Sequence, residues 1–462
     1  MIKMKKNYVG ILVSLALFSV SVVYAQSESA VTENSGKTAE EPVVRLTIEQ
    51  AVDYARENSK TLQSSAIDLE IKKRASSYSW NQFMPSVQVT GTMSRKNEVT
   101  PISIPGITMP PQPDPTEADH WTAVGGVSVS WNFSAAMIES IRLAKRDYEA
   151  GLISWDQTLR QTELQIEKLF YGLLLQEESL KIQQDSLENA RLRMEQARIN
   201  YLNGLIPELS YIQAQVSYQN MKPSVMKQEQ LLKQQLDMFG FLIGLPTGIK
   251  IELEGAIEPP HIDLVAQDLV DISMENNPDI LLLNKNLEIL KLTYSMQNLQ
   301  TYIPSLSLSW GFQPVISDIQ ENWIDKYTDG GSFSATLVWN LTNMLPFSAN
   351  QQKAKDTKDN IRKMELSLET LKENTALNIR TQIDNLNQAW ANIEAASGNI
   401  TLAQKSYDMN VTSYQNGTRE LLDVKDAESQ LNQAKLGLIN SKYEYLTGLL
   451  DLEYSLNIDL IN

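Results

Sequence analysis

The chain repeats one order of elements in its two halves. The segment AVDYARENSKTL (51–62) resembles LVDISMENNPDI (269–280) at an offset of 218 residues, and YLNGLIPEL (201–209) resembles YQNGTRELL (414–422) at an offset of 213. Offsets that change so little along the chain indicate an internal duplication. A chain of this kind is expected to fold into two structurally equivalent halves, and its function must use both.

Each half is predicted to contain a capped helix, two strands joined by a loop, and a long helical hairpin. A linker, residues 249–262, joins the halves. The first repeat spans 45–248, with strands at 86–96 and 122–133 and its hairpin at 134–244. The second repeat spans 263–462, with strands at 305–316 and 331–342 and its hairpin at 349–457.

The N-terminus predicts export from the cytoplasm. Lys3, Lys5 and Lys6 precede an apolar run from Val9 to Val23. The run is followed by a small-residue cleavage site at Ala25, so residues 1–25 are predicted to be a secretory signal peptide. A membrane anchor is the alternative, but the run is shorter than the roughly 20 residues that a spanning helix needs. Residues 26–44 are mostly polar and are predicted to be a disordered leader.

The composition excludes several classes of function. The formal net charge is −16, which argues against a nucleic-acid partner. There is no cysteine, so the chain has no disulfide, no thiol nucleophile and no cysteine metal ligand. The two histidines, His120 and His261, are far apart, and no phosphate-binding or nucleophile motif occurs. We therefore predict a protein without enzymatic activity, cofactor or metal.

Apolar residues recur at every seventh position in the predicted hairpins. A strict seven-residue repeat makes helices supercoil left-handedly, because the seam would otherwise drift away from its partner. Residues 137–203 as one helix would reach about 100 Å at ~1.5 Å per residue. A structural coiled coil that spans the envelope without a pore is the alternative interpretation. The seam of the first arm is Leu152, Leu159, Ile166, Leu173, Leu180, Leu187, Met194 and Tyr201, and similar seams occupy the other three arms.

Apolar and polar residues alternate in the four predicted strands. Val127, Val129 and Trp131, for example, alternate with Ser128 and Ser130. A period of two over about ten residues is typical of an outer-membrane barrel strand. A half-buried sheet in a soluble protein is the alternative. We expect three tryptophans to join an interfacial aromatic girdle, namely Trp131, Trp310 and Trp339.

Four strands are too few for a membrane barrel. About eight strands is the minimum for closure, and open sheet edges are not tolerated in lipid. If these are membrane strands, several chains must share one barrel.

The tip of the second predicted hairpin carries a resemblance to a known family. The sequence SYQNGTRELLDVKDAESQL (413–431) is similar to the pattern of TolC-like outer membrane efflux proteins, as is LIGLPTG (242–248). The resemblance covers nearly all of the chain after the signal peptide. It implies an α+β membrane protein with a duplicated TolC-like fold, in which each chain supplies four transmembrane β-strands and long coiled-coil α-helices to a trimeric α/β barrel.

The resemblance also implies a function. It indicates the outer membrane exit duct of a tripartite efflux or type I secretion system, with a helical tube in the periplasm. The implied partners are two further copies in a homotrimer, a periplasmic adaptor (membrane fusion) protein, an inner-membrane transporter and outer membrane lipid. The resemblance does not identify the transported substrate.

The same resemblance implies site residues at the second tip. Asp423 and Asp426 match the acidic rings at the family's periplasmic mouth, and Tyr414 and Arg419 match the restraint that holds the second hairpin closed. Two acids three residues apart share one helix face, and around a threefold axis their carboxylates would attract cations. A solvated acidic patch is the alternative interpretation of these acids.

Three residues depart from the family pattern near this mouth. Leu209 and Ser210 stand in the first hairpin where the family commonly has Thr followed by Asp, so the carboxylate partner of Arg419 is left open. Lys425 lies between the two acids, where a positive charge would offset them.

Overall fold

The computed structural model describes residues 43–99, 114, 116–246, 248–316 and 327–460. The predicted signal peptide, 1–25, lies outside the described residues, as does the predicted leader up to residue 42. That leader was expected to extend to residue 44. In the structure, strand β1 (Val43–Leu46) already includes its last two residues and pairs in parallel with β4 (Lys250–Leu253).

The long helical hairpins are the most regular feature of the fold. The first consists of α3 (Ala136–Leu202) and α4 (Glu208–Ile243), and the second of α7 (Ala349–Gln415) and α8 (Leu421–Leu456). The outgoing arms both have 67 residues and the return arms both have 36. All four pairs of ends differ by 213 residues, so the two hairpins are equivalent residue by residue.

The turns of the two hairpins are built alike. Gly204 and Gly417 both have a φ of 72°, a left-handed conformation that glycine adopts without steric cost. Each donates its N–H at 2.9 Å to the carbonyl of the tyrosine three residues before it, Tyr201 or Tyr414. This tight closure ends each outgoing helix and returns the chain along it.

Two helices, not one, precede the strands in each half. The sequence predicted a single capped helix, whereas the structure has α1 (Ile48–Asn58) with α2 (Lys60–Ser77), and α5 (Ala266–Asn276) with α6 (Pro278–Tyr302). The second break has a clear cause, because the Asn277 side chain accepts from the N–H groups of Asp279 and Ile280 at 3.0 and 3.2 Å. Proline at the first position of α6 reinforces this new start.

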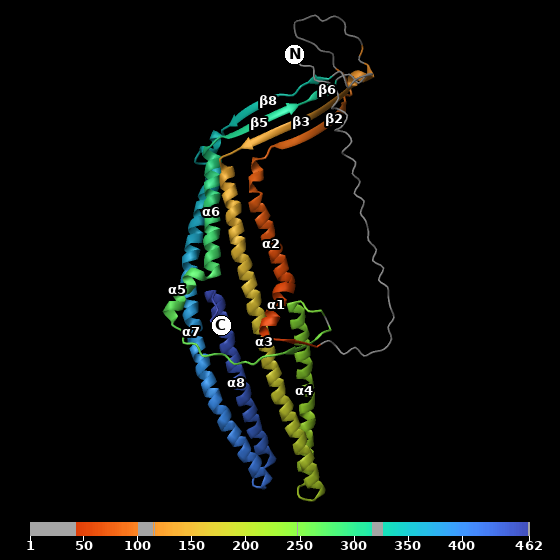
Figure 1. Ribbon diagram of the computed structural model, residues 1–462, viewed down its shortest axis with the longest axis vertical. Helices are drawn as coiled ribbons and strands as arrows, with labels where there is room; N and C mark the ends of the chain where they lie inside the picture. The colour runs from red at the N-terminus through yellow and green to blue at the C-terminus, as the bar shows by residue number, and fades with distance from the viewer. Residues whose placement is uncertain (1–42, 100–113, 115, 247, 317–326, 461–462) are drawn as a thin grey trace. The chain divides into compact units, whose positions relative to one another are not determined.

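The helices lie side by side in four columns, here called lanes, that run along the length of the hairpins (Figure 1). In the half of the hairpins nearer the sheet, α2 packs on α3, α3 on α6, and α6 on α7 (Figure 1). In the half nearer the hairpin turns, α4 packs on α3, α3 on α8, and α8 on α7 (Figure 1). Across the molecule, the first lane is α2 followed by α4 toward the turns, and the second lane is α3. The third lane is α6 followed by α8 toward the turns, and the fourth lane is α7. Within the described part of the chain, no helix is both long and apolar enough to cross a membrane.

The strands form one antiparallel sheet at the end of the helices (Figure 1). Its central strand β3 (Trp121–Phe133) pairs with β2 (Ser86–Arg95) on one side. On the other side it pairs with β5 (Ser305–Phe312) and β6 (Pro314–Ile316). Beyond these lie β8 (Phe333–Val338) and the short β7 (Thr328–Asp329).

The second predicted strand pair is more broken than the first. The predicted strand 305–316 is interrupted at Gln313, whose N–H donates to the Asp329 side chain at 3.1 Å instead of continuing the ladder. The predicted strand 331–342 ends early, because Leu341–Met344 form a 3₁₀ helix, η4. Two more 3₁₀ helices, η1 (Ser79–Phe83) and η2 (Glu117–His120), precede β2 and β3.

Cross-strand register gives the sheet one apolar face and one polar face. Val129 pairs with Val87 on one side and with Trp310 on the other, and Trp310 pairs in turn with Phe333. The neighbouring row is polar throughout: Ser130 pairs with Ser86 and Ser309, and Ser309 pairs with Ser334. The hydroxyls of Ser309 and Ser334 lie 2.7 Å apart. Because side chains alternate along a strand, these rows belong to opposite faces.

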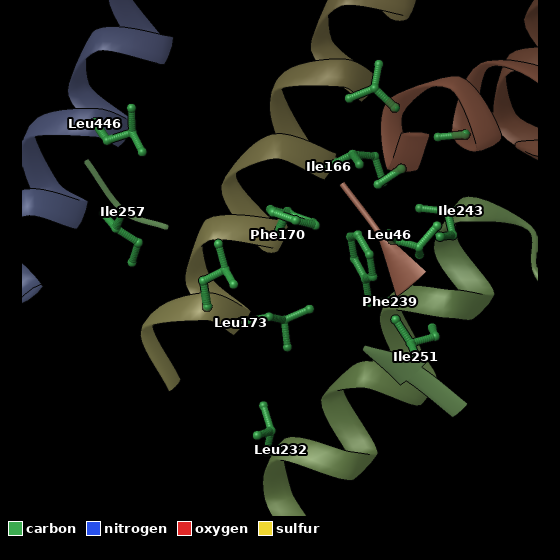
Figure 2. Close-up of a cluster of buried hydrophobic side chains, with 14 of the residues drawn as sticks. Leu46, Ile166, Phe170, Leu173, Leu232, Phe239, Ile243, Ile251, Ile257 and Leu446 are labelled. Carbon is green, nitrogen blue, oxygen red and sulfur yellow. The ribbon is translucent and has the colours of Figure 1, made fainter. Parts of the chain in front are cut away.

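The apolar core lies at the middle of the hairpins, where α1, α3, α4 and the small sheet meet (Figure 2). Phe170, Phe239 and Ile243 are fully buried there. The residues after β4 are not a loose connection. Ile257 is buried in the same core, and farther along the His261 ring lies 4.4 Å from the Trp390 ring of α7. The segment 254–262 therefore connects the first hairpin to the second through packed side chains.

Candidate functional site

The second hairpin tip brings the predicted site residues together. Tyr414 is in the last turn of α7, Arg419 is in the turn, and Asp423 and Asp426 are in the first two turns of α8. Arg419 Nη1 lies 3.8 Å from Asp423 Oδ2, and both side chains are about half exposed, at 55% and 42%. The carboxylate partner that the sequence left open for Arg419 is therefore in its own hairpin.

Asp423 also fixes the start of α8. The backbone N–H of Glu420 donates to Asp423 Oδ2 at 3.4 Å, and the Glu420 side chain accepts from the Asp423 N–H. This reciprocal cap satisfies two helix donors that would otherwise lack partners. Asp426 and Lys425 are exposed one turn farther along. Asp423 is thus held in a local network, whereas Asp426 points its charge into solvent.

The first hairpin has no acids at the equivalent positions. At the offset of 213, Asp423 corresponds to Ser210 and Asp426 to Gln213, and Tyr414 corresponds to Tyr201. The Tyr201 ring stacks on Tyr211 of the same hairpin, with ring centroids 6.0 Å apart. The acids at these two positions are therefore particular to the second hairpin, although the two backbones match and the first tip carries its own acid, Glu208, in the first turn of α4.

A polar cluster between the two hairpins escaped the sequence analysis. Arg193 of α3 forms an ion pair with Glu428 of α8, and Asn189 donates to the same carboxylate at 3.3 Å. One turn nearer the core, Asn432 donates to the Ser186 hydroxyl at 2.9 Å. These residues are separated by more than half the chain, so no local pattern pairs them. We call this cluster the polar joint: Ser186, Asn189 and Arg193 of α3 with Glu428 and Asn432 of α8.

A half-buried carboxylate lies near the middle of α3. Burial, together with the nearby carboxylates of Glu453 and Glu163, raises the pKa of Glu167 to about 7, while Arg56 acts in the opposite direction. Burial, with the Glu167 charge, also raises the pKa of the Tyr171 hydroxyl. In the described residues, no three acidic or histidine side chains gather closely enough to hold a metal ion.

The three predicted girdle tryptophans are exposed on the apolar side of the sheet. Trp131 pairs with Leu308, and Trp310 pairs with Val129, which places both in apolar rows. Trp339 directly follows β8 and continues the alternation of Phe333, Ala335 and Leu337. Their exposed fractions are 37%, 48% and 54%. Large apolar side chains open to the surroundings on one sheet face suit contact with lipid.

Solved outer membrane channels share this fold. The CmeC outer membrane channel of Campylobacter jejuni aligns with a TM-score of 0.72 and 13% identity, covering 88% of this chain and 85% of CmeC. CusC aligns with a TM-score of 0.71 and 14% identity, covering 93% of this chain and 96% of CusC. At this level of identity, the likeness concerns the fold.

Sequence comparison establishes the family. The outer membrane protein TolC of Salmonella enteritidis is 34% identical over 89 residues, which span 19% of this chain and 18% of TolC. The chain thus matches less than a fifth of the length of this curated relative. The family described as outer membrane efflux protein matches over residues 51–244 and 269–457, which is most of the chain. The chain therefore belongs to the outer membrane efflux protein family.

Membership defines the general role of the molecule. It is an outer membrane protein of an efflux family, with long helices in the periplasm. Its family consists of channel proteins, not enzymes.

Proposed function

We propose that three copies of this chain form one passive duct, which receives substrates from a periplasmic adaptor and an inner-membrane transporter and releases them outside the cell. The observation that carries this proposal is the sheet. It has one apolar face and one hydroxyl-rich face, and its outer strands β2 and β8 each have one side without a partner in the described chain. In lipid, such edges must be paired.

Copies of the chain can satisfy these edges by pairing head to tail. Counting the interrupted pairs β5 with β6 and β8 with β7 as one strand each, every copy contributes four strands to the sheet. If β2 of one copy pairs with β8 of the next, three copies supply twelve strands, which is above the roughly eight-strand minimum for a closed barrel. The apolar face would then meet lipid, and the polar face would line the lumen. A ring of this kind leaves no open edge.

The helices support the same closure. The outer lanes are α2 with α4 on one side and α7 on the other, and they continue from the outer strands β2 and β8. Both lanes expose large apolar side chains that a neighbouring copy would cover. They include Ile67 and Ile71 of α2, Met226 and Phe241 of α4, and Leu377 and Leu402 of α7.

The second hairpin tips would form the periplasmic mouth of this duct. Asp423 and Asp426 from each copy would surround the axis and attract cations. Tyr414 and Arg419 would restrain the same tip, with Arg419 acting through its ion pair with Asp423. The adaptor is expected to dock around this end of the helices. Because the chain carries no nucleotide-binding motif, the energy for transport must come from the partner transporter.

Cross-linking between the two sheet edges tests the proposed assembly. The chain has no cysteine, so Gln88→Cys on β2 and Thr336→Cys on β8 can be introduced together without competing thiols. A short bismaleimide should convert the double variant into a covalent trimer and nothing larger. The matched controls are the two single variants, which should remain monomers on a denaturing gel because head-to-tail pairing brings unlike edges together.

Three outcomes would contradict the shared barrel. One is a ladder of products beyond the trimer. Another is efficient cross-linking of either single variant, which would mean that like edges meet. The third is a stable monomer in detergent with full β-structure.

A further inference from the structure

We infer that a groove on the lumen wall of the duct binds the apolar part of small, uncharged organic molecules in transit. The groove lies near the middle of the first hairpin, where α3 is flanked by α4 and α8. Its volume of about 290 Å³ is at the lower end of the range for sites that hold small organic ligands. This inference rests on the proposed function, because only a tube has a lumen. The lining residues are Leu169, Gly172 and Gln176 of α3, Met238 and Leu242 of α4, and Tyr443 of α8.

The groove opens on the face of α3 that points away from the segment after β4. Gly255 of that segment lies against Phe170 and Leu174, because a Cβ added at Gly255 would be 3.6 Å and 3.4 Å from their side chains. Gly172 is two residues from each of them, which places it roughly 160° around the helix from both. A Cβ added at Gly172 would lie 3.4 Å from Tyr443 Oη, on the α8 side of the groove. The groove and the segment are therefore on opposite faces of the helix layer.

The face with the groove is the lumen side of the proposed tube. The segment 254–262 crosses the hairpins without joining any of the four lanes (Figure 1). Inside a tube, three such segments would obstruct the passage, whereas outside it they would leave the passage free. The segment therefore belongs on the outer surface, and the opposite face of α3 lines the lumen. The flanking helices α4 and α8 come from the same chain, so the groove does not lie at a joint between copies.

The second repeat shows that the fold does not require an apolar surface here. Three apolar residues of the groove correspond to polar residues at the offset of 213: Leu169 to Gln382, Met238 to Asp451, and Leu242 to Ser455. In the second hairpin, Gln382 Nε2 donates to the Ser455 hydroxyl at 3.4 Å. The two hairpins have equal helix lengths, so the same backbone accepts a polar lining at these positions.

The apolar lining is exposed in a polar setting. Leu169 is 43% exposed, although Gln165 and Gln176, four residues before it and seven residues after it, share its helix face. Across the groove, Met238 and Leu242 are 59% and 43% exposed. Exposed apolar side chains that gather at one place indicate a binding surface. A methionine among them lets the surface adapt to ligands of different shapes, because its side chain is flexible and polarizable.

The charges at the groove favour an uncharged occupant. Lys168 is the one charged residue that lines the groove in the described chain, and it forms an ion pair with Asp451. No unmatched charge is then left for a charged ligand. Burial, together with the Asp451 charge, raises the pKa of the Tyr443 hydroxyl, so the hydroxyl stays protonated and can donate to a polar atom of the ligand. The expected occupant has an apolar part and few polar groups.

Equilibrium dialysis with N-phenyl-1-naphthylamine, an uncharged apolar dye, tests the inference on trimers in lipid nanodiscs, with empty nanodiscs as the blank. The parent should bind one dye per chain in a saturable manner. Leu169→Gln with Leu242→Ser introduces the residues of the second repeat and should weaken binding by about tenfold or more, because two apolar contacts are lost. The matched control is Leu192→Gln with Leu202→Ser, which changes exposed leucines of α3 away from the groove and should bind like the parent.

A thiol placed in the groove tests its position on the lumen wall. The chain has no cysteine, so Gln176→Cys provides a single reactive site per chain. A charged, water-soluble thiol reagent should lower the single-channel conductance of this variant, and the dye should slow the reaction. A thiol that does not react in the trimer would mean that another copy covers the groove. A reaction that leaves the current unchanged would place the groove outside the lumen, and either result overturns the inference.

The outcomes separate this inference from the function beneath it. A parent trimer that never conducts would overturn the proposed function and this inference together. A conducting parent that binds no dye above the blank, or no more tightly than Leu169→Gln with Leu242→Ser does, would overturn this inference alone. If the double variant does not assemble, Met238→Gln changes a more exposed side chain of the same groove and is judged by the same criterion.

Discussion

Arg419 and Asp423 form an ion pair within the second hairpin, with Nη1 and Oδ2 separated by 3.8 Å. An exposed pair of this kind contributes about 0 to 1 kcal/mol to stability, so its main effect is on the local charge. Asp423 is paired with the Arg419 guanidinium and also caps α8, whereas Asp426 has neither role in the described chain. The two acids of the mouth are therefore not equivalent.

This difference predicts unequal effects on ion selectivity. Asp426→Asn should lower the preference of the trimer for cations, and its block by multivalent cations, more than Asp423→Asn does. The double variant should lower both further and still assemble, because both side chains contact solvent. Reversal potentials in a salt gradient measure the effect. Gln213→Asn, at the equivalent position of the first hairpin, is the control. Equal selectivity in the parent and the double variant would remove both acids from the narrowest point.

Loosening the tip should widen the mouth. Tyr414→Phe with Arg419→Glu replaces the ion pair with two carboxylates that repel each other across the start of α8. We expect single-channel conductance to rise while cation preference is kept. Arg198→Glu, which changes an exposed arginine of the first hairpin, is the control for altered charge. Parental conductance in the double variant would show that the tip does not limit the pore.

The seven-residue seam predicts a large cost for a buried charge. Leu173 is 5% exposed and belongs to the main core cluster. Leu173→Asp should destabilise the assembled protein by about 3 to 5 kcal/mol, because its carboxylate would have no partner. Gln161→Asp adds the same charge at an exposed position of α3 and should change stability by less than about 0.5 kcal/mol. Thermal melting of the trimers measures both. A parental melting curve for Leu173→Asp would mean that the seam is not packed.

Glu167 predicts that stability falls as the pH rises. Its pKa in the folded chain is about 7, above the ordinary value of 4.5, so the folded protein holds a proton that the unfolded chain has released. Stability is therefore lost between pH 4.5 and about 7. Glu167→Gln should remove this loss, stabilising the protein by up to about 2 kcal/mol at pH 8 and changing little at pH 4.

The control for this prediction is Glu369→Gln, which removes an exposed carboxylate from α7. It should leave the pH profile of the melting temperature unchanged. If Glu167→Gln and the parent have parallel profiles from pH 4 to pH 8, Glu167 ionises normally and its surroundings are wetter than the structure indicates.

Much of the helical architecture was readable from the sequence, because periodicity reports packing directly. Ile379, Leu386 and Ile393 were predicted to form a seam, and all three are buried. Leu152 belongs to the first seam but is 42% exposed. It lies in the half of α3 nearer the sheet, where the neighbours of α3 are α2 and α6 instead of α4 and α8. The seven-residue repeat of one helix does not show that its neighbouring helices change along its length.

The features that escaped prediction depend on contacts between distant segments. The β1–β4 pair joins Val43 to Lys250, and its first strand looked like the end of a polar leader. The pair of Arg193 and Glu428 spans 235 residues. Isolated charges beside an apolar seam resemble solvated positions, and only the fold brings these two together. The tip acids were found through resemblance to a family, and their unequal surroundings required the structure.

Recording from purified trimers in a planar bilayer tests the central claim most directly. If three chains share one barrel and one mouth, each trimer should open a single pore that prefers cations, and multivalent cations should block it from the side of the hairpin tips. Conductance should scale with the number of trimers inserted. Three independent conductance steps per trimer, or a native trimer that assembles fully and carries no current, would contradict the account.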